Sequence, residues 1–214
     1  KYASNAFLAM KVSFINMIAN LCETLPAADV TEIAEGIGLD KRIGPLFLNA
    51  GAGWGGSCFR KDLTALQAHA KSLHINLPLV DATLQINEDR PSRIVEMAEG
   101  LIGNLAGKTV AVLGLAFKPD TDDMRDAVSV KVISSLLERG AKVAAYDPAA
   151  HDAAYAILGK KISYASSAEE CLENADCALI LTEWEEFTRL KPEDFRRRMK
   201  TPCIVDGRRI YHPI

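Results

Sequence analysis

This chain of 214 residues lacks the patterns that mark several large classes of protein. Its five cysteines are scattered and form no Cys-x-x-Cys pair, which argues against a disulfide framework and against a metal site. No stretch is densely basic and the net charge is −3, so nucleic acid is not an expected partner. We find no uninterrupted apolar run long enough to span a bilayer and no signal peptide. These absences predict a protein of the reducing cytoplasm that makes no contact with membranes.

The composition that remains is ordinary for a globular protein. Hydrophobic residues make up 49% of the chain and charged residues 25%, and the length suits one large domain or two small ones. The chain opens inside an apolar, helix-patterned run without a cap residue or start methionine. We therefore expect it to be the interior of a longer protein.

Apolar residues at helical spacing dominate the first hundred positions. Asp29 has the character of an N-cap residue, Pro78 suits a first helical turn, and Pro91 is expected to kink or split the helix that contains it. We predict helices over residues 1–23, 29–38, 61–72 and 78–102.

The pattern then changes to short apolar runs that alternate with helical stretches. We predict strands over residues 109–114, 143–147, 162–164, 178–181 and 203–206. Strands that alternate with helices form a parallel sheet covered on both faces. The chain is therefore predicted to be α/β: an all-helical domain over residues 1–105, followed by a Rossmann-like, doubly wound parallel-sheet domain over residues 106–214.

The run from Gly51 to Asp62 contains four glycines, Cys58 and a Lys-Asp pair. Glycine is common where the backbone takes unusual dihedrals or approaches a ligand closely. A thiol beside such a loop, with an acid four residues on, is what covalent catalysis by cysteine requires. The alternative is a tight turn between two helices that carries an inert, buried cysteine.

Polar clusters follow the predicted strands, at the sheet edge where ligands of this fold bind. Lys118, Arg125 and Arg208 could converge there on an anion such as phosphate. The loop after the first strand lacks the Gly-x-Gly-x-x-Gly fingerprint, so we expect a nucleotide-type fold without the standard dinucleotide loop. The alternative is that these charges form ordinary salt bridges within loops.

Six segments, taken together and in this order, resemble the UDP-glucose/GDP-mannose dehydrogenase family. The resemblance is to its central and C-terminal domains and covers essentially the whole chain. It implies a helical dimerisation domain followed by a domain that holds a nucleotide sugar, without the NAD-binding domain with which family members begin. The segments are Lys1–Phe7, Asp40–Gly44, Gly53–Asp62, Leu113–Lys118, Thr182–Trp184 and Asp206–Arg209.

The resemblance also implies four catalytic residues. Cys58 matches the nucleophile that captures the intermediate aldehyde, and Asp62 matches the acid that acts with water. Lys1 and Asn5 match the residues that stabilise oxyanions. Their spacing of four residues places both on one face of a helix, which supports the match independently.

Further residues match binding positions of the family. Arg42 matches an arginine that reaches the substrate of the neighbouring subunit in a homodimer, while Lys61 and Arg125 match positions near NAD. Substrate contacts are implied for Gly53, Trp54, Gly55, Gly56, Ser57, Phe117, Lys118 and Arg208.

The implied reaction is the oxidation of the C6 hydroxyl of UDP-glucose to UDP-glucuronate. It takes two NAD-dependent steps and passes through a cysteine thioester. This chain alone is expected to bind the UDP-sugar and to dimerise but not to turn over, because it carries no NAD-binding domain. The alternatives are GDP-mannose or UDP-N-acetylmannosamine as the substrate, or a non-catalytic module for dimerisation and nucleotide-sugar binding.

Overall fold

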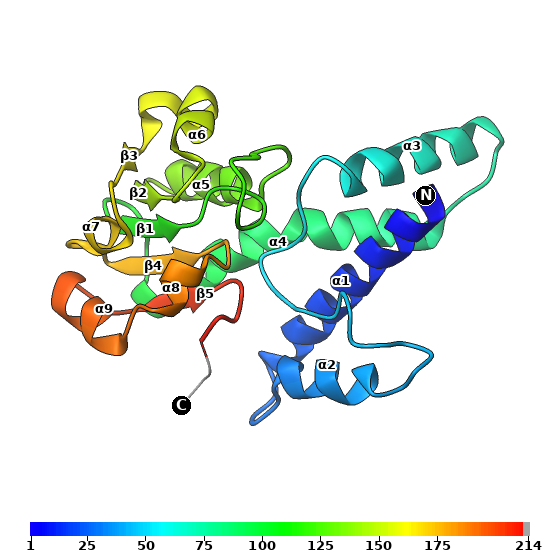
Figure 1. Cartoon of the computed structure of the whole chain (residues 1–214), viewed down its shortest axis with the longest axis horizontal. Helices are drawn as coiled ribbons and strands as arrows, with labels where there is room; N and C mark the ends of the chain where they lie inside the picture. Colours follow the sequence, from blue (N-terminus) through cyan, green and yellow to red (C-terminus); the bar gives the residue numbers. More distant parts are fainter. Residues whose placement is uncertain (212–214) are drawn as a thin grey trace. The chain divides into compact units, whose positions relative to one another are not determined.

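A computed structural model describes residues 1–211 of the chain, which Figure 1 colours along the sequence. The residues form two compact units, one over Lys1–Arg90 and one that begins at Pro91. The boundary lies inside helix α4 (Pro78–Ile102). The predicted division at residues 105 and 106 instead follows the change from helices to strands.

The first unit consists of helices, as its sequence pattern predicts. Helix α1 (Tyr2–Cys22) is followed by α2 (Val30–Gly38), α3 (Phe59–Ser72) and the first part of α4. The Asp29 side chain caps α2 by accepting a hydrogen bond from the Thr31 N–H, at 2.6 Å. Apolar residues of α1 pack against α2 and the segment after it, in a cluster that includes Ile15, Ala19, Val30 and Leu48.

Pro91 does not split the helix, contrary to one of the two outcomes that its position predicts. Helix α4 runs as one element of 25 residues through this proline. Buried side chains just after Pro91, among them Ile94 and Val95, hold this part of the helix in the second unit. Tertiary packing thus outweighs the missing N–H, whose usual effect is to break a helix.

Helix α1 is apolar on average, although Lys11 interrupts its apolar residues. Among the described residues it is the one helix long and apolar enough to cross a membrane, with a mean hydropathy of 1.3. One such helix near an N-terminus is weak evidence for a span, because core helices pass the same test. Ser13 and Asn16 of α1 are fully buried and hydrogen-bonded within the first unit, which favours the core helix.

The second unit contains a five-stranded parallel sheet in the order β3-β2-β1-β4-β5, which confirms the predicted doubly wound class. Its strands are β1 (Thr109–Leu113), β2 (Lys142–Tyr146), β3 (Ser163–Tyr164), β4 (Cys177–Ile180) and β5 (Ile204–Asp206). The connecting helices are α5 (Val128–Glu138), α6 (His151–Leu158), η1 (Gly159–Lys161), α7 (Ala168–Leu172), α8 (Glu185–Thr188) and α9 (Pro192–Arg198).

Side chains alternate across the buried strands of this sheet. Ala111 and Leu113 of β1 point to the face covered by α7, α8 and α9, where Phe187 is fully buried. Val110 and Val112, equally buried, point to the opposite face. The central strands β1 and β4 are therefore buried on both sides, which leaves only their ends for ligands.

Gly114, directly after β1, is a position of the second unit where the packing leaves no room for a side chain. Its φ is +95°, and a Cβ atom there would lie 2.5 to 2.6 Å from atoms of Thr182. We expect Gly114→Ala to lower the free energy of unfolding by about 2 kcal/mol or more, because a left-handed backbone and a backbone clash combine. Urea denaturation measures the change.

Gly100 is the matched control, because it lies in helix α4 with no heavy atom within 4 Å of its own Cβ position. Gly100→Ala should raise stability by up to about 1 kcal/mol, through helix propensity alone. Equal effects of the two substitutions would contradict the close packing of Gly114 against Thr182.

Candidate active site

The first unit gathers a buried carboxylate, an amide and an ammonium group. Asp62, in the first turn of α3, is completely buried. Its Oδ2 accepts a hydrogen bond from Asn5 Nδ2 at 2.6 Å and lies 3.5 Å from Lys1 Nζ. The Oδ1 atom has no hydrogen-bond partner among the described residues. A buried carboxylate oxygen is rarely left unpaired, so this atom is suited to a water molecule or a bound ligand.

Cys58 lies one helical turn before Asp62 and is the N-cap residue of α3. The spacing of four residues places the thiol and the carboxylate on the same face of the helix. Cys58 is exposed and forms no disulfide, so it is not the buried cysteine of the alternative interpretation. The N-terminus of a helix also favours negative charge on nearby groups, which suits an anionic sulfur or oxygen.

The glycine loop before Cys58 is held by the amide of Asn87, on α4. Asn87 Oδ1 accepts from the Trp54 N–H at 2.8 Å, and its Nδ2 donates to the Trp54 carbonyl at 2.9 Å. At Gly53 the φ is +115°, and a Cβ atom there would lie 2.8 Å from Asn87 Oδ1. Glycine is thus required here by the approach of the loop to Asn87.

Two further side chains fix the start of the same loop. Asn16 Oδ1 of α1 accepts from the Gly51 N–H at 2.7 Å, and Arg90 Nε of α4 donates to the Gly51 carbonyl at 2.9 Å. Arg90 also donates to the side chain of Asn20. The loop is therefore bound to two helices before any ligand arrives.

Trp54 faces inward, although the resemblance implies a substrate contact for it. Its side chain is 6% exposed, packs in a cluster with Ala9 and Leu63, and donates from Nε1 to Ser13 Oγ at 3.1 Å. The structure therefore gives the indole a role in anchoring the loop. Ser57 Oγ lies 3.7 Å from Cys58 Sγ, next to the thiol.

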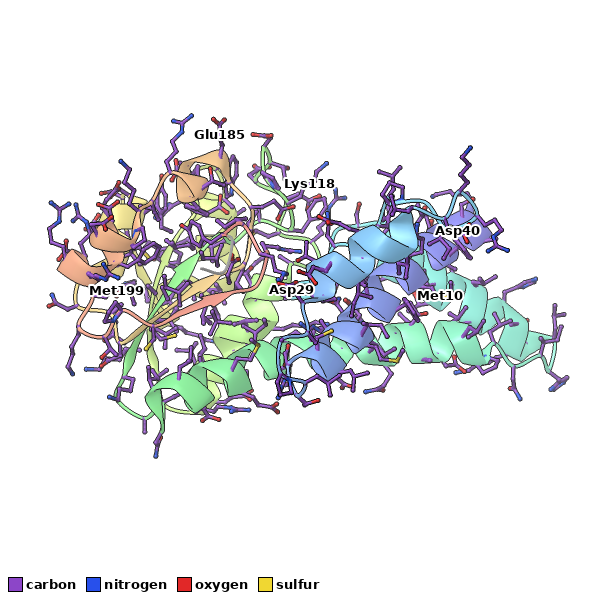
Figure 2. All side chains as sticks on the ribbon, turned by 90° about the horizontal axis from the view of Figure 1, so that it is seen from below. Met10, Asp29, Asp40, Lys118, Glu185 and Met199 are labelled. Atoms are coloured by element: carbon purple, nitrogen blue, oxygen red, sulfur yellow. The ribbon has the colours of Figure 1, made fainter. Side chains whose placement is uncertain are left out.

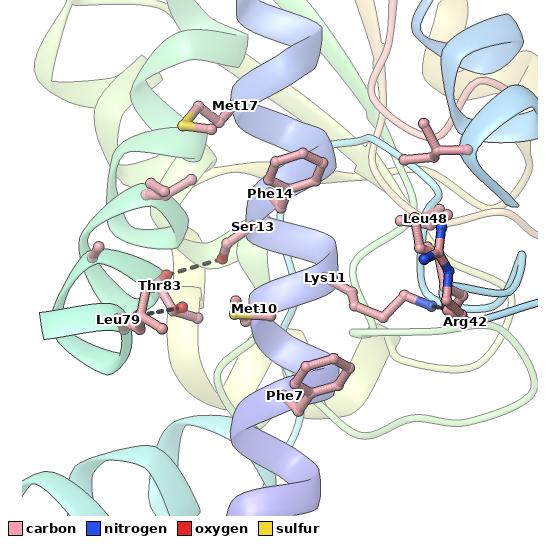
Figure 3. A pocket seen from close by; sticks show the side chains of 14 residues that line it. Phe7, Met10, Lys11, Ser13, Phe14, Met17, Arg42, Leu48, Leu79 and Thr83 are labelled. Atoms are coloured by element: carbon pink, nitrogen blue, oxygen red, sulfur yellow. Dashed lines mark hydrogen bonds between the residues drawn. The ribbon is translucent and has the colours of Figure 1, made fainter. Parts of the chain in front are cut away.

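Arg42 lies on the turn after α2 and is tied to Asp40. Its Nε and Nη2 atoms donate to both carboxylate oxygens, and this pairing lowers the pKa of Asp40 below its usual range. Figure 3 shows Lys11 of α1 extending toward this turn, where its Nζ donates to the carbonyls of Ile43 and Gly44 at 3.0 and 3.2 Å. The turn is held in place while the guanidinium remains exposed.

In the second unit Lys118 lies on the loop after β1, as Figure 2 shows. Its side chain is exposed, and the ammonium lies 5.5 Å from the centre of the Phe117 ring. Arg208 follows β5 and is partly buried: its Nε donates to the Leu181 carbonyl at 2.7 Å and lies 3.3 Å from Glu183 Oε2. Burial lowers the pKa of Arg208, and the charge of Glu183 opposes that shift.

Arg125 repeats the arrangement of Arg42. Its guanidinium donates to both oxygens of Asp123, whose pKa is lowered mainly by this hydrogen bonding. Arg125 thus has the geometry of the predicted alternative, a salt bridge within a loop, and Arg42 has the same geometry. Lys61, expected near NAD, is exposed on α3 in the first unit.

The polar residues of α1 and α4 that support the glycine loop are not among those predicted from the sequence, and all of them except the exposed Asn20 are buried. Ser13, Asn16 and Asn20 recur at spacings of three and four residues along α1. Thr83, Asn87 and Arg90 recur in the same way along α4. Polar side chains at helical spacing on otherwise apolar helix faces are a readable signal, because such positions need hydrogen-bond partners.

The structure thus combines a helical unit that carries a cysteine and a buried carboxylate with a unit built on a nucleotide-type parallel sheet. Comparison with known proteins identifies the family in which these two units occur together. Residues 1–89 match the central domain of the UDP-glucose/GDP-mannose dehydrogenase family, and residues 111–213 match its UDP binding domain. The chain belongs to this family.

Named relatives agree with this assignment. UDP-glucose 6-dehydrogenase TuaD of Bacillus subtilis is 46% identical over 99% of this chain and 46% of its own length. Among solved structures, a UDP-glucose dehydrogenase from Pyrobaculum islandicum has a TM-score of 0.91 and 41% identity, covering 98% of this chain and 47% of that one. A UDP-D-ManNAc dehydrogenase from Pyrococcus horikoshii has a TM-score of 0.83 and 28% identity, covering 100% and 48%. This chain thus spans about half the length of these relatives.

The exposure of Cys58 predicts its reactivity. Cys22, Cys171 and Cys177 are buried and Cys203 is partly buried. We expect Ellman's reagent to label one thiol of the folded protein rapidly, and Cys58→Ser to abolish that fast phase. Cys171→Ser is the control and should leave the fast phase unchanged. A fast phase that survives in Cys58→Ser would contradict the exposed position of this thiol.

Proposed function

We propose that this chain is the catalytic-cysteine and UDP-sugar-binding part of an NAD-dependent UDP-glucose 6-dehydrogenase. The observation that carries the proposal is the convergence of Lys1 and Asn5 on the buried Asp62, one turn after the exposed Cys58. The family match to a UDP binding domain and the names of the relatives support it.

The residues of this site suit the steps of such an oxidation that need no cofactor, namely the addition of the thiol and the hydrolysis of the thioester. The Cys58 sulfur adds to the C6 aldehyde, forming a C–S bond and an oxyanion. The Lys1 ammonium and the Asn5 amide lie where they can stabilise that oxyanion. At the thioester stage Asp62 accepts a proton from the attacking water, the C–S bond breaks, and the leaving Cys58 sulfur takes that proton from Asp62 to become the thiol again.

The remaining steps, two hydride transfers, require NAD, and the described residues do not fit it. The loop after β1 lacks the Gly-x-Gly-x-x-Gly fingerprint, and the one run of that spacing, Gly51–Gly56, precedes helix α3 and follows no strand of the sheet. The two N–H groups that directly follow Gly114 after β1 are bonded to the carboxylate of Asp147. We therefore expect no NADH to form from UDP-glucose with this chain alone.

The nucleotide part of the substrate is assigned to the second unit. Lys118 and Arg208 each follow the carboxyl end of a strand, where ligands of doubly wound sheets bind. An exposed ammonium and a guanidinium anchored by Leu181 can meet the charges of a diphosphate. A non-catalytic nucleotide-sugar module remains the second candidate, because the residues that the structure describes offer binding groups for the nucleotide sugar while the loop after β1 is occupied by Asp147.

Substitution of Cys58 separates the enzyme from the binding module. In a full-length dehydrogenase that carries this sequence, Cys58→Ser should lower UDP-glucuronate release by roughly a thousandfold or more, because an alkoxide forms less readily than a thiolate. Calorimetric titration of UDP-glucose into the same variant should give an unchanged Kd. Unchanged turnover would remove Cys58 from the mechanism.

The same titration, with the unsubstituted chain and three ligands, decides the sugar. UDP-glucose should bind more tightly than GDP-mannose and UDP-N-acetylmannosamine. A clear preference for GDP-mannose would overturn the choice of substrate while leaving the catalytic proposal intact.

We also propose that the chain forms a homodimer in the cytoplasm through its first unit. Helix α1 exposes large apolar side chains, including Phe7, Phe14 and Leu21. Phe7 and Phe14 line an apolar pocket of about 440 Å³ with Met10, Leu79 and other residues of the same unit, as Figure 3 shows. A patch of this kind marks an interface in a folded protein.

Phe14→Glu tests the dimer, because it places a charge on this apolar face. Light scattering at micromolar concentration should show a mass of about twice 23.3 kDa for the unsubstituted chain and a monomer for Phe14→Glu. Tyr155, at the same 44% exposure in the second unit, is the matched control, and Tyr155→Glu should stay dimeric. A monomeric unsubstituted chain would contradict the proposal.

A further inference from the structure

We propose that Asp147 is a positioning residue that shapes the UDP site by holding the loop that carries Lys118. The inference rests on the proposed binding of a UDP-sugar by the second unit. Asp147 directly follows β2 and is 5% exposed, so its own carboxylate is not available to a ligand.

The carboxylate of Asp147 accepts hydrogen bonds from three segments at the carboxyl end of the sheet. Its Oδ2 accepts from the N–H groups of Leu115 and Ala116, at 2.7 and 3.0 Å, and from Trp184 Nε1 at 3.2 Å. Its Oδ1 accepts from the N–H groups of Ala149 and Ala150, both at 2.9 Å. One side chain thus ties together the loops after β1, β2 and β4.

The N–H groups of Leu115 and Ala116 occupy a special position in this fold. In dinucleotide-binding sheets, the backbone N–H groups just after the first strand bind the phosphates of the ligand. Here an internal carboxylate takes the place of that anion. The charge of a bound diphosphate must therefore be met by side chains farther along the loop, and Lys118 is two residues on.

The carbonyl groups of the same loop are held from the other side. Ser129 Oγ donates to the Leu115 carbonyl, and Thr182 Oγ1 donates to the Ala116 carbonyl at 2.7 Å. Thr182 adjoins Leu181, whose carbonyl binds the guanidinium of Arg208. Lys118 and Arg208 are thus connected through one network of hydrogen bonds, to which Asp147 contributes the acceptors for the Leu115 and Ala116 N–H groups.

Asp147→Asn tests the role, because it keeps the size of the side chain but turns an NH2 group toward N–H donors. Calorimetry compares UDP with uridine, which lacks the phosphates. We expect the ratio of the uridine Kd to the UDP Kd to fall by about tenfold, because Lys118 is displaced. A double-mutant cycle of Asp147→Asn with Lys118→Met should show coupling, because each substitution removes the contribution of Lys118 to phosphate binding.

Asp176→Asn is the matched control. Asp176 is also a buried carboxylate of this sheet, and it accepts from the Thr109 N–H at the opposite end of β1. Asp176→Asn should lower the melting temperature and leave the ratio of the uridine Kd to the UDP Kd unchanged. Thr182→Val removes the opposite clamp at nearly constant volume, so it should lower the ratio as well and provides a second variant if Asp147→Asn does not fold.

The outcomes distinguish this inference from the proposed function. If the unsubstituted chain binds UDP no better than uridine, the proposed nucleotide site is wrong and the role of Asp147 falls with it. If the unsubstituted chain prefers UDP and folded Asp147→Asn or Thr182→Val keeps the full ratio, only the role of Asp147 is overturned. Additive effects of Asp147→Asn and Lys118→Met would likewise overturn it.

Discussion

Both loops that carry the proposed chemistry depend on buried side chains that satisfy backbone groups no helix or strand can pair. A buried N–H or C=O without a partner costs as much as a lost hydrogen bond, so an irregular loop needs donors and acceptors from elsewhere. Asn87 supplies both for Trp54 in the first unit. In the second unit Asp147 accepts from N–H groups of the loop after β1, and Thr182 donates to a carbonyl of the same loop. In both units an element remote in sequence thereby sets the position of a reactive or charged side chain.

Much of this organisation could be predicted from sequence because it rests on local periodicity. The helices and strands lie within a few residues of their predicted bounds, and the doubly wound order follows from the alternation of the two. The spacing of four residues between Lys1 and Asn5 predicts that both lie on one face of α1, and both side chains do contact Asp62. That the partner is Asp62 of α3 could not be predicted from the spacing, because it depends on how the two helices pack.

The remainder could not be predicted because it depends on where side chains point in three dimensions. Trp54 adjoins a glycine in a motif that implies substrate contact, yet its indole is buried against Ser13. Arg42 and Arg125 each follow an aspartate two residues earlier, and in both cases the short link lets the acid bind the guanidinium. Pro91 would break an isolated helix, but the packing around Ile94 maintains it. Local sequence rules describe what a residue prefers, and these sites show where tertiary contacts decide instead.

The internal carboxylate of the second unit has a consequence for the energetics of recognition. A loop that must fold around its ligand loses conformational entropy at the moment of binding, and that loss subtracts from affinity. The loop after β1 already surrounds a negative group that belongs to the chain itself. Its ordering cost is therefore met during folding, so the nucleotide binding that we propose would not have to supply it.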